Sequence, residues 1–99
     1  MATGTINLSS KKHIETGQTE SITIAASTRK TYTPKFTEAF SDTSYKIFLT
    51  MEISQTNSEY GLISCAAYNA STTGFTIAVF NHSTSSKQNI IIHWIAAEL

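Results

Sequence analysis

The chain has 99 residues, which is enough for one domain and too short for two separate cores. Seven basic residues balance seven acidic ones, so the net charge is 0 and no strong field attracts nucleic acid or an acidic membrane. Charged residues are only 14% of the chain, while 13 serines and 16 threonines supply neutral hydrogen-bonding groups, as on a β-rich surface.

The first thirty residues carry the weakest pattern. Segments 4–9 and 21–25 each alternate apolar and polar residues, so both are predicted as short strands. Residues 10–20 and 26–30 are polar and are predicted as connections. We therefore expect a loop-rich opening to the single domain 1–99, or an arm that docks on a neighbouring subunit.

The pattern becomes regular further along the chain. Pro34 is the only proline, and it is tolerated at a strand edge or bulge, so segment 32–36 is predicted at an edge. Residues 45–53 have an apolar side chain at every odd position, which predicts a half-buried strand flanked by polar turns. Phe48 points to the other face of this strand, where we expect it to pack against a neighbouring chain.

Three more strands are expected after residue 60. Residues 60–69 form the first, and in the turn that follows Gly74 is expected to supply a positive φ. Residues 75–80 alternate, and residues 89–97 are apolar on both faces, as in a central strand or a subunit interface. No segment of useful length has helical periodicity. The sequence predicts an all-β fold, a six- to seven-stranded antiparallel β-sandwich.

Several aromatic and turn residues follow one another in a distinctive order. They are Phe36, Phe40, the strand 45–53, Tyr68, Thr73-Gly74-Phe75 and Ile92-His-Trp-Ile-Ala96. This order, which covers about two thirds of the chain, resembles the H-type lectin domain of snail agglutinins and discoidins, also found at the tips of many phage tail fibres. The resemblance implies a six-stranded antiparallel sandwich that forms a parallel homotrimer and binds sugars in clefts between subunits.

The sugar site of that family is kept only in part. An arginine early in the strand before Thr-Gly-Phe is replaced here by Leu62, which cannot hydrogen-bond a hydroxyl group. An aromatic residue and a histidine follow the next strand in the family, and those positions hold His82 and Ser83. A histidine is present, but the flat stacking ring is absent. The resemblance thus supports the scaffold more than the ligand.

The candidate ligand-binding residues lie at strand ends. They are Asn81, His82, Ser83, Glu59 and Tyr60. The first three offer amide, imidazole and hydroxyl groups that suit sugar hydroxyls, and a solvated turn is the alternative interpretation. The other two offer a carboxylate and an aromatic face.

No catalytic residue is assigned, and the chain is not expected to be an enzyme, because its carboxylates show no pairing pattern. Cys65 is the only cysteine, so no intrachain disulfide forms, and we expect a small buried hydrophobe and not a nucleophile. The three histidines have no cysteine partner at metal-binding spacing, so neither a metal nor a cofactor is expected. Trp94 lies in an apolar strand and is expected in the core.

The sequence therefore predicts a non-enzymatic carbohydrate-binding or adhesive module. We expect a homotrimer in a phage virion, as part of a tail or fibre, that contacts host surface glycans or other virion proteins. The first alternative is a structural virion or assembly protein that keeps the trimeric fold without binding sugar. The second is a cytoplasmic lectin used in defence. No signal peptide and no apolar run near the ~20 residues of a membrane span are visible, so a cytoplasmic location is expected if the chain is not phage-encoded.

Overall fold

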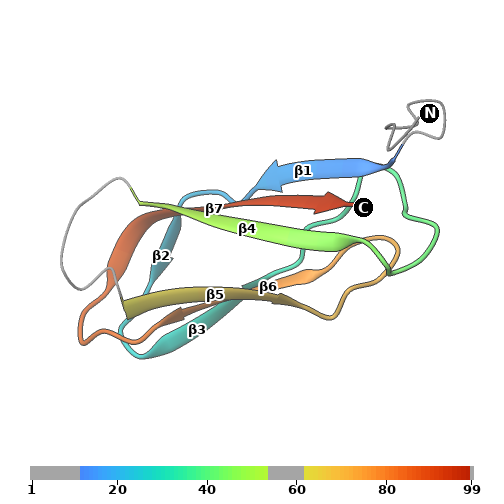
Figure 1. Cartoon of the computed structure of the whole chain (residues 1–99). Coiled ribbons are helices and arrows are strands. Elements are labelled where there is room, and N and C mark those ends of the chain that lie inside the picture. The colour runs from blue at the N-terminus through green and yellow to red at the C-terminus, as the bar shows by residue number, and fades with distance from the viewer. Residues whose placement is uncertain (1–11, 54–61, 99) are drawn as a thin grey trace.

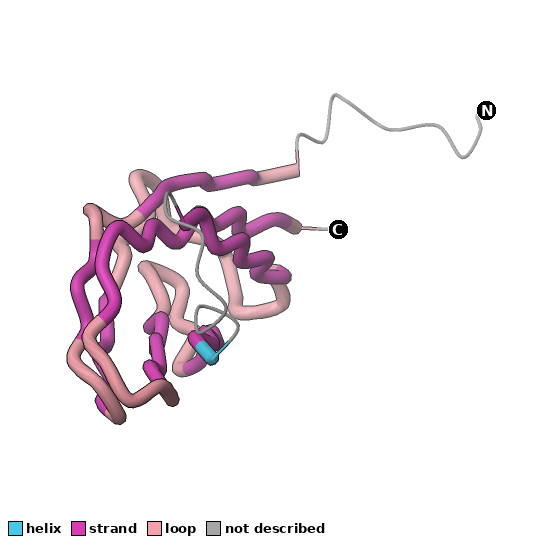
Figure 2. The backbone as a smooth tube through the Cα atoms, turned by 90° about the vertical axis from the view of Figure 1, so that its left-hand side faces the viewer, coloured by secondary structure: helices cyan, strands magenta, loops and turns pink. Residues whose placement is uncertain are grey.

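The computed structural model describes residues 12–53 and 62–98. These residues form seven strands in two antiparallel sheets that pack as a β-sandwich (Figure 1). Figure 2 shows the two layers from the side. The predicted fold class, an all-β antiparallel sandwich of six to seven strands, is confirmed. The strand predicted over 4–9 lies outside the described residues.

The first sheet is organised around its longest strand. Its members are β1 (Ile14–Gln18), β2 (Ile22–Ile24), β4 (Lys46–Ile53) and β7 (Lys87–Ala97). One edge of β7 pairs with β4 over eight residues, and its other edge pairs with β1 and then with β2. β7 is therefore the central strand of this sheet, as its two apolar faces predicted.

The second sheet has three strands. In spatial order they are β3 (Thr28–Tyr32), β6 (Thr76–Asn81) and β5 (Ile63–Tyr68). Ile77 and Val79 of the central strand point into the sandwich and are fully buried, whereas Phe80 is half-buried and belongs to the outer face. The alternation predicted for 75–80 is confirmed.

The core lies between the sheets. Its buried members are Ile22, Ile24, Phe40, Tyr45, Ile63, Phe75, Ile77, Val79, Ile90, Ile92, Trp94 and Ala96. Each fully buried isoleucine contributes about 1.5–3 kcal/mol of transfer free energy. Trp94 is only 6% exposed, which confirms its prediction as a core residue.

Aromatic rings close one end of the sandwich. The loop 33–45 places the Phe36 ring 4.8 Å from that of Phe40 and 5.9 Å from that of Trp94. The Phe40 ring stacks on Tyr45 at 4.4 Å, and the Tyr45 hydroxyl donates a hydrogen bond of 2.7 Å to the Ser71 carbonyl. The aromatic residues that carried the family resemblance thus have a structural role here.

The turn before β6 is tied to this loop through backbone hydrogen bonds. The Phe36 N–H donates to the Thr73 carbonyl and the Phe40 N–H donates to the Thr72 carbonyl, each at 2.9 Å. The expected positive φ at Gly74 was wrong, because Asn69 adopts it instead with φ 59°. Gly74 is needed for a different reason: a Cβ atom there would collide with the Pro34 carbonyl oxygen.

Two of the predicted connections were wrong, because each contains an edge strand. β1 falls within 10–20, and Gly17 of β1 faces Trp94, where a Cβ atom would lie 2.5 Å from the indole Cζ2. β3 begins within 26–30, and four of its five residues are exposed. Polar, exposed edge strands resemble loops in sequence, because only their pairing requires a strand. The predicted segment 32–36 is mostly loop, with one bridge from Lys35 to Gly74.

Candidate functional site

Asn81, the last residue of β6, points into the protein. It is 1% exposed. Its amide nitrogen donates to the Ile24 carbonyl at 3.0 Å and to the Ser85 carbonyl at 2.9 Å, and its amide oxygen accepts the Ser83 N–H at 2.9 Å. The side chain therefore joins the end of β2 to the loop before β7.

Ser83 takes part in the same network. It is 1% exposed, and its hydroxyl donates toward the Asn81 amide oxygen at 2.6 Å and the Ser85 carbonyl at 2.8 Å. Asn81 and Ser83 together shape the loop, and their polar groups are engaged within the protein. Their arrangement places the intervening residue on the surface.

His82 is that exposed residue, and it lies on the outer face of the second sheet. Its ring is nearly parallel to that of Phe80, with a centroid separation of 5.6 Å and an interplanar angle of 7°. The Ser64 hydroxyl lies 3.2 Å from its Nε2 atom. His82 is thus held by one stacking contact and one hydrogen bond while it remains open to solvent.

Strand pairing brings the positively charged Arg29 next to Phe80 on this surface. In the register of the second sheet, Phe80 faces Arg29 on one side and Ser64 on the other. The Arg29 guanidinium carbon lies 5.8 Å from the centre of the Phe80 ring, within the range of a cation–π contact. The sequence did not predict either Arg29 or Phe80 as site residues, although the spacing of Phe80 and His82 indicates a common face.

A shallow hollow of about 310 Å³ lies at this end of the second sheet. Its lining residues are Ser27, Thr28, Arg29, Phe80, Asn81 and His82. We refer to the surface formed by Arg29, Phe80, His82 and Ser64 as the Phe80 surface. It offers ring faces, a positive charge and hydroxyl groups on an open, shallow surface.

The remaining predicted site residues are less informative. Glu59 and Tyr60 lie outside the described residues. Leu62, the residue that the lectin resemblance matches to an arginine, is 47% exposed, and its carbonyl accepts the His82 N–H at 3.0 Å. Leu62 is thus joined to the backbone of His82, but it brings no polar side chain to that place.

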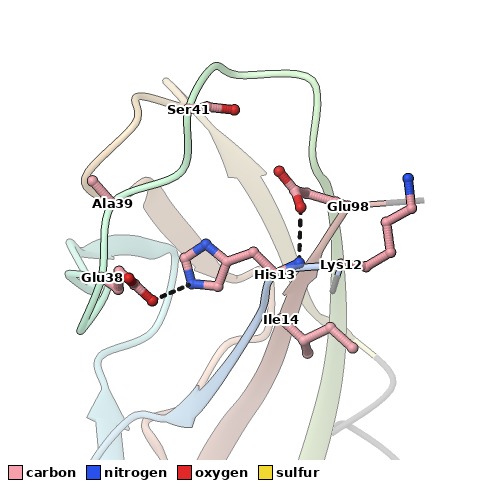
Figure 3. A pocket seen from close by; sticks show the side chains of 7 residues that line it. All are labelled: Lys12, His13, Ile14, Glu38, Ala39, Ser41 and Glu98. Atoms are coloured by element: carbon pink, nitrogen blue, oxygen red, sulfur yellow. Dashed lines mark hydrogen bonds and ion pairs between the residues drawn. The ribbon is translucent and has the colours of Figure 1, made fainter. Parts of the chain in front are cut away.

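A second and larger hollow, of about 610 Å³, lies beside the start of β1 (Figure 3). His13 is its central residue. The His13 Nε2 atom lies 2.7 Å from a Glu15 carboxylate oxygen and 3.9 Å from one of Glu38, and the His13 ring stacks on Phe40 at 4.2 Å. The Glu98 carboxylate accepts the His13 backbone N–H at 2.8 Å.

Glu15 fastens β1 to the aromatic loop. Its carboxylate accepts the backbone N–H of Thr37 at 2.9 Å and that of Glu38 at 3.2 Å. The hydrogen bond with the His13 side chain, followed by that from Thr37, holds the pKa of Glu15 below its ordinary value of 4.5. Glu15 and Glu98 hold separate segments together at this hollow, so we assign it a structural role.

Residues 12–53 and 62–98 offer little support for a metal-ion site or for a nucleophilic cysteine. Within these ranges no three His, Cys, Asp or Glu side chains converge where they could hold a metal ion. Cys65 is half-buried against the core, and burial raises the pKa of its thiol, which disfavours the thiolate. The described part of the chain contains no helix that is long and apolar enough to cross a membrane.

Comparison with known proteins supports the fold. No protein-family model matches the chain. No curated protein matches it either. Among solved structures, the chain is similar to an N-truncated R1-type pyocin tail fibre, with a TM-score of 0.70 and 15% sequence identity. The match covers 91% of this chain and 73% of the tail-fibre chain. Two chains that differ at most positions therefore share one sandwich.

Asn81→Ala is expected to destabilise the fold by at least about 2 kcal/mol, because it leaves several buried polar groups without partners. His82→Ala, one residue away but exposed, is expected to change the free energy of unfolding by no more than about 0.5 kcal/mol. Urea denaturation followed by the fluorescence of Trp94, the only tryptophan, measures both values. Equal stabilities of Asn81→Ala and the wild type would contradict the structural role of Asn81.

Because the pKa of Glu15 is lowered in the folded protein, we expect the protein to lose stability in acid. A lowered pKa in the folded state stabilises the protein above the ordinary value of 4.5, and this contribution disappears as the pH falls through the lower folded-state pKa. Glu15→Gln is therefore expected to be less stable than the wild type at neutral pH and to lose less stability on acidification. Urea denaturation from about pH 7 to about pH 3 measures this slope. Glu20→Gln, an exposed carboxylate in the β1–β2 connection, is the control and should keep the wild-type slope.

Proposed function

We propose that this chain is a non-enzymatic attachment module of a phage tail or fibre, which assembles as a homotrimer and binds host surface glycans. The fold likeness to a tail fibre supports the type of protein. The single observation that carries the binding role is the Phe80 surface, where His82 is exposed, oriented and bordered by a hollow of about 310 Å³. The module works as part of a virion and requires neither metal nor cofactor.

The outer face of the first sheet supports self-association. Ile14, Phe48 and Ile95 are 59%, 51% and 45% exposed, and Phe48 and Ile95 are direct partners in the register of β4 and β7. Exposed large apolar side chains that gather on one sheet face and are bordered by polar residues, here Lys46 and Thr50 of β4, commonly mark a site of association. In the register of the sheet, Ile14 of β1 faces Ala97 of β7, so the apolar cluster spans β1, β7 and β4 near the end of β7.

A second copy of the chain is the proposed partner of this face. On the same face, His93 Nε2 lies 2.6 Å from a Glu52 carboxylate oxygen, so these two polar side chains contact each other. Association of like surfaces would therefore leave Glu52 with a hydrogen-bonding partner. The resemblance to H-type lectins indicates three copies, and a trimer would increase the strength of individually weak sugar contacts through multivalency.

The alternative function is a structural virion protein that keeps the trimer and binds no sugar. The specific observation in its favour is Leu62, which brings an apolar side chain where the lectin family has an arginine. This alternative shares the assembly surface with the main proposal and differs only at the Phe80 surface. Two experiments therefore test the assembly and the binding separately.

Phe48→Lys is expected to convert the trimer to a monomer, because it places a charge in the apolar contact between subunits. Sedimentation velocity or light scattering coupled to gel filtration measures the mass. Tyr68→Lys is the matched control, because Tyr68 is 46% exposed on the other sheet, and it should leave the mass unchanged. A monomeric wild type, or dissociation by Tyr68→Lys alone, would be incompatible with the proposed interface.

His82→Ala is expected to weaken glycan binding by at least about tenfold, which corresponds to ~1.4 kcal/mol per site. The wild-type trimer and the variant are compared on an oligosaccharide array, followed by titration of the strongest ligands. Thr84→Ala, an exposed change in the same loop, is the control and should bind as the wild type does. Failure of the folded trimer to bind any glycan would favour the structural alternative.

A further inference from the structure

Arg29 has no carboxylate partner among residues 12–53 and 62–98. Its guanidinium contacts the Phe80 ring, and no ion pair to a described acidic residue forms. The neighbouring Lys30 points elsewhere and donates a hydrogen bond of 2.6 Å to the Thr23 carbonyl. The Arg29 guanidinium thus lies over the Phe80 ring, and its positive charge is exposed on the surface.

Charge is unevenly distributed between the two sheets. The strands of the second sheet contain no aspartate or glutamate. The acidic residues that the structure describes all lie in the first sheet or in loops outside the second one, and they are Glu15, Glu20, Glu38, Asp42, Glu52 and Glu98. An anion that approaches the Phe80 surface therefore meets the cation of Arg29, and the strands of this sheet carry no carboxylate that would repel it.

The chemistry of the hollow matches an anionic group attached to a sugar ring. A guanidinium presents paired N–H donors that fit carboxylate and phosphate oxygens in a bidentate manner, and stacking on an aromatic ring limits the motion of that fork. The hollow beside it is lined by Ser27, Thr28 and His82, which add polar groups of the kind that bind sugar hydroxyls. The two kinds of group lie in one concave surface.

We propose that Arg29 makes the Phe80 surface selective for acidic sugars, in which a carboxylate or a phosphate binds the guanidinium while the sugar ring contacts His82. This inference rests on the proposed function, because it names the class of glycan that the same surface takes. It goes beyond the resemblance to H-type lectins, whose arginine position is occupied by Leu62 and not by a residue of β3. The two sources of negative charge share one chemistry, and the test separates them.

The test uses immobilised oligosaccharides in pairs that differ only in the acidic group. One set compares a carboxylated sugar with its methyl ester, and the other compares a phosphorylated sugar with its dephosphorylated form. The wild-type chain of 99 residues is expected to prefer the acidic member of one set by about tenfold or more, and this preference should decrease with added salt. The set that shows the preference identifies the anion.

Variants then assign the preference to Arg29. Arg29→Gln should abolish the preference, so that the acidic and the neutral member of each pair bind alike, because the charged contact is removed. Arg29→Lys should keep part of the preference, since it keeps the charge and loses the bidentate fork. Lys12→Gln is the matched control, because it removes one exposed positive charge beside β1, whose start lies at the other end of the molecule from the β2–β3 turn (Figure 1).

The outcomes separate this inference from the proposed function. Equal binding of acidic and neutral glycans by the wild type, or a preference that persists in Arg29→Gln, would overturn the role of Arg29 while glycan binding stands. Loss of the preference in Lys12→Gln as well would show a general charge effect and would also overturn it. Absence of binding to every oligosaccharide would overturn the proposed function and this inference with it. Thermal unfolding of each variant confirms that the fold is retained.

Discussion

A strand of eleven residues with two apolar faces has to be covered on both sides, and this requirement dominates the structure. β7 meets it on one face by packing Ile90, Ile92 and Trp94 against the second sheet, where all three are at least 94% buried. Its edges are covered by β4 on one side and by β1 and β2 on the other. The opposite face, with Ile95 and its neighbour Phe48, is left exposed within one subunit. The same constraint that builds the core therefore also leaves the surface that we assign to assembly.

The sequence predicted the strands whose alternation is set by the core, and it missed those that are held by pairing alone. In β2, β4, β6 and β7 apolar residues at every second position face the core, so the sequence pattern located these strands. β1 and β3 are edge strands with polar or charged residues, and their place follows from hydrogen bonds to β7 and β6. Gly17 illustrates the difference, because it weakens the strand pattern locally yet provides the room that Trp94 occupies. This role of Gly17 can be recognised only in the folded chain, where β1 lies beside β7.

The residues of the candidate site also fall into two groups: those that sequence alternation could place, and those that only strand pairing brings together. A loop rich in amide and hydroxyl groups suggested three adjacent ligand-binding residues, but alternation places Asn81 and Ser83 inside and His82 outside. Period two also puts Phe80 on the side of His82, so this pair was accessible to sequence reasoning. Arg29 was not, because fifty-one positions separate it from Phe80 and only the β3–β6 register brings the two together. Polar residue types indicate that a loop can bind, whereas burial decides which of them are available to a ligand.

The two outer faces of a sandwich point in opposite directions, and here they differ in chemistry. One carries the apolar row of Phe48 and Ile95, and the other carries Arg29 and His82 around Phe80. A subunit that buries the first face against its copies directs the second away from them. On the proposed assembly each subunit thus presents its own hollow outward, in contrast to the clefts between subunits that the lectin resemblance implies. Such an arrangement makes binding in one subunit independent of side chains from the next. It also lets a trimer contact a surface covered with repeated sugars through several weak sites at once, where avidity and not single-site affinity determines attachment.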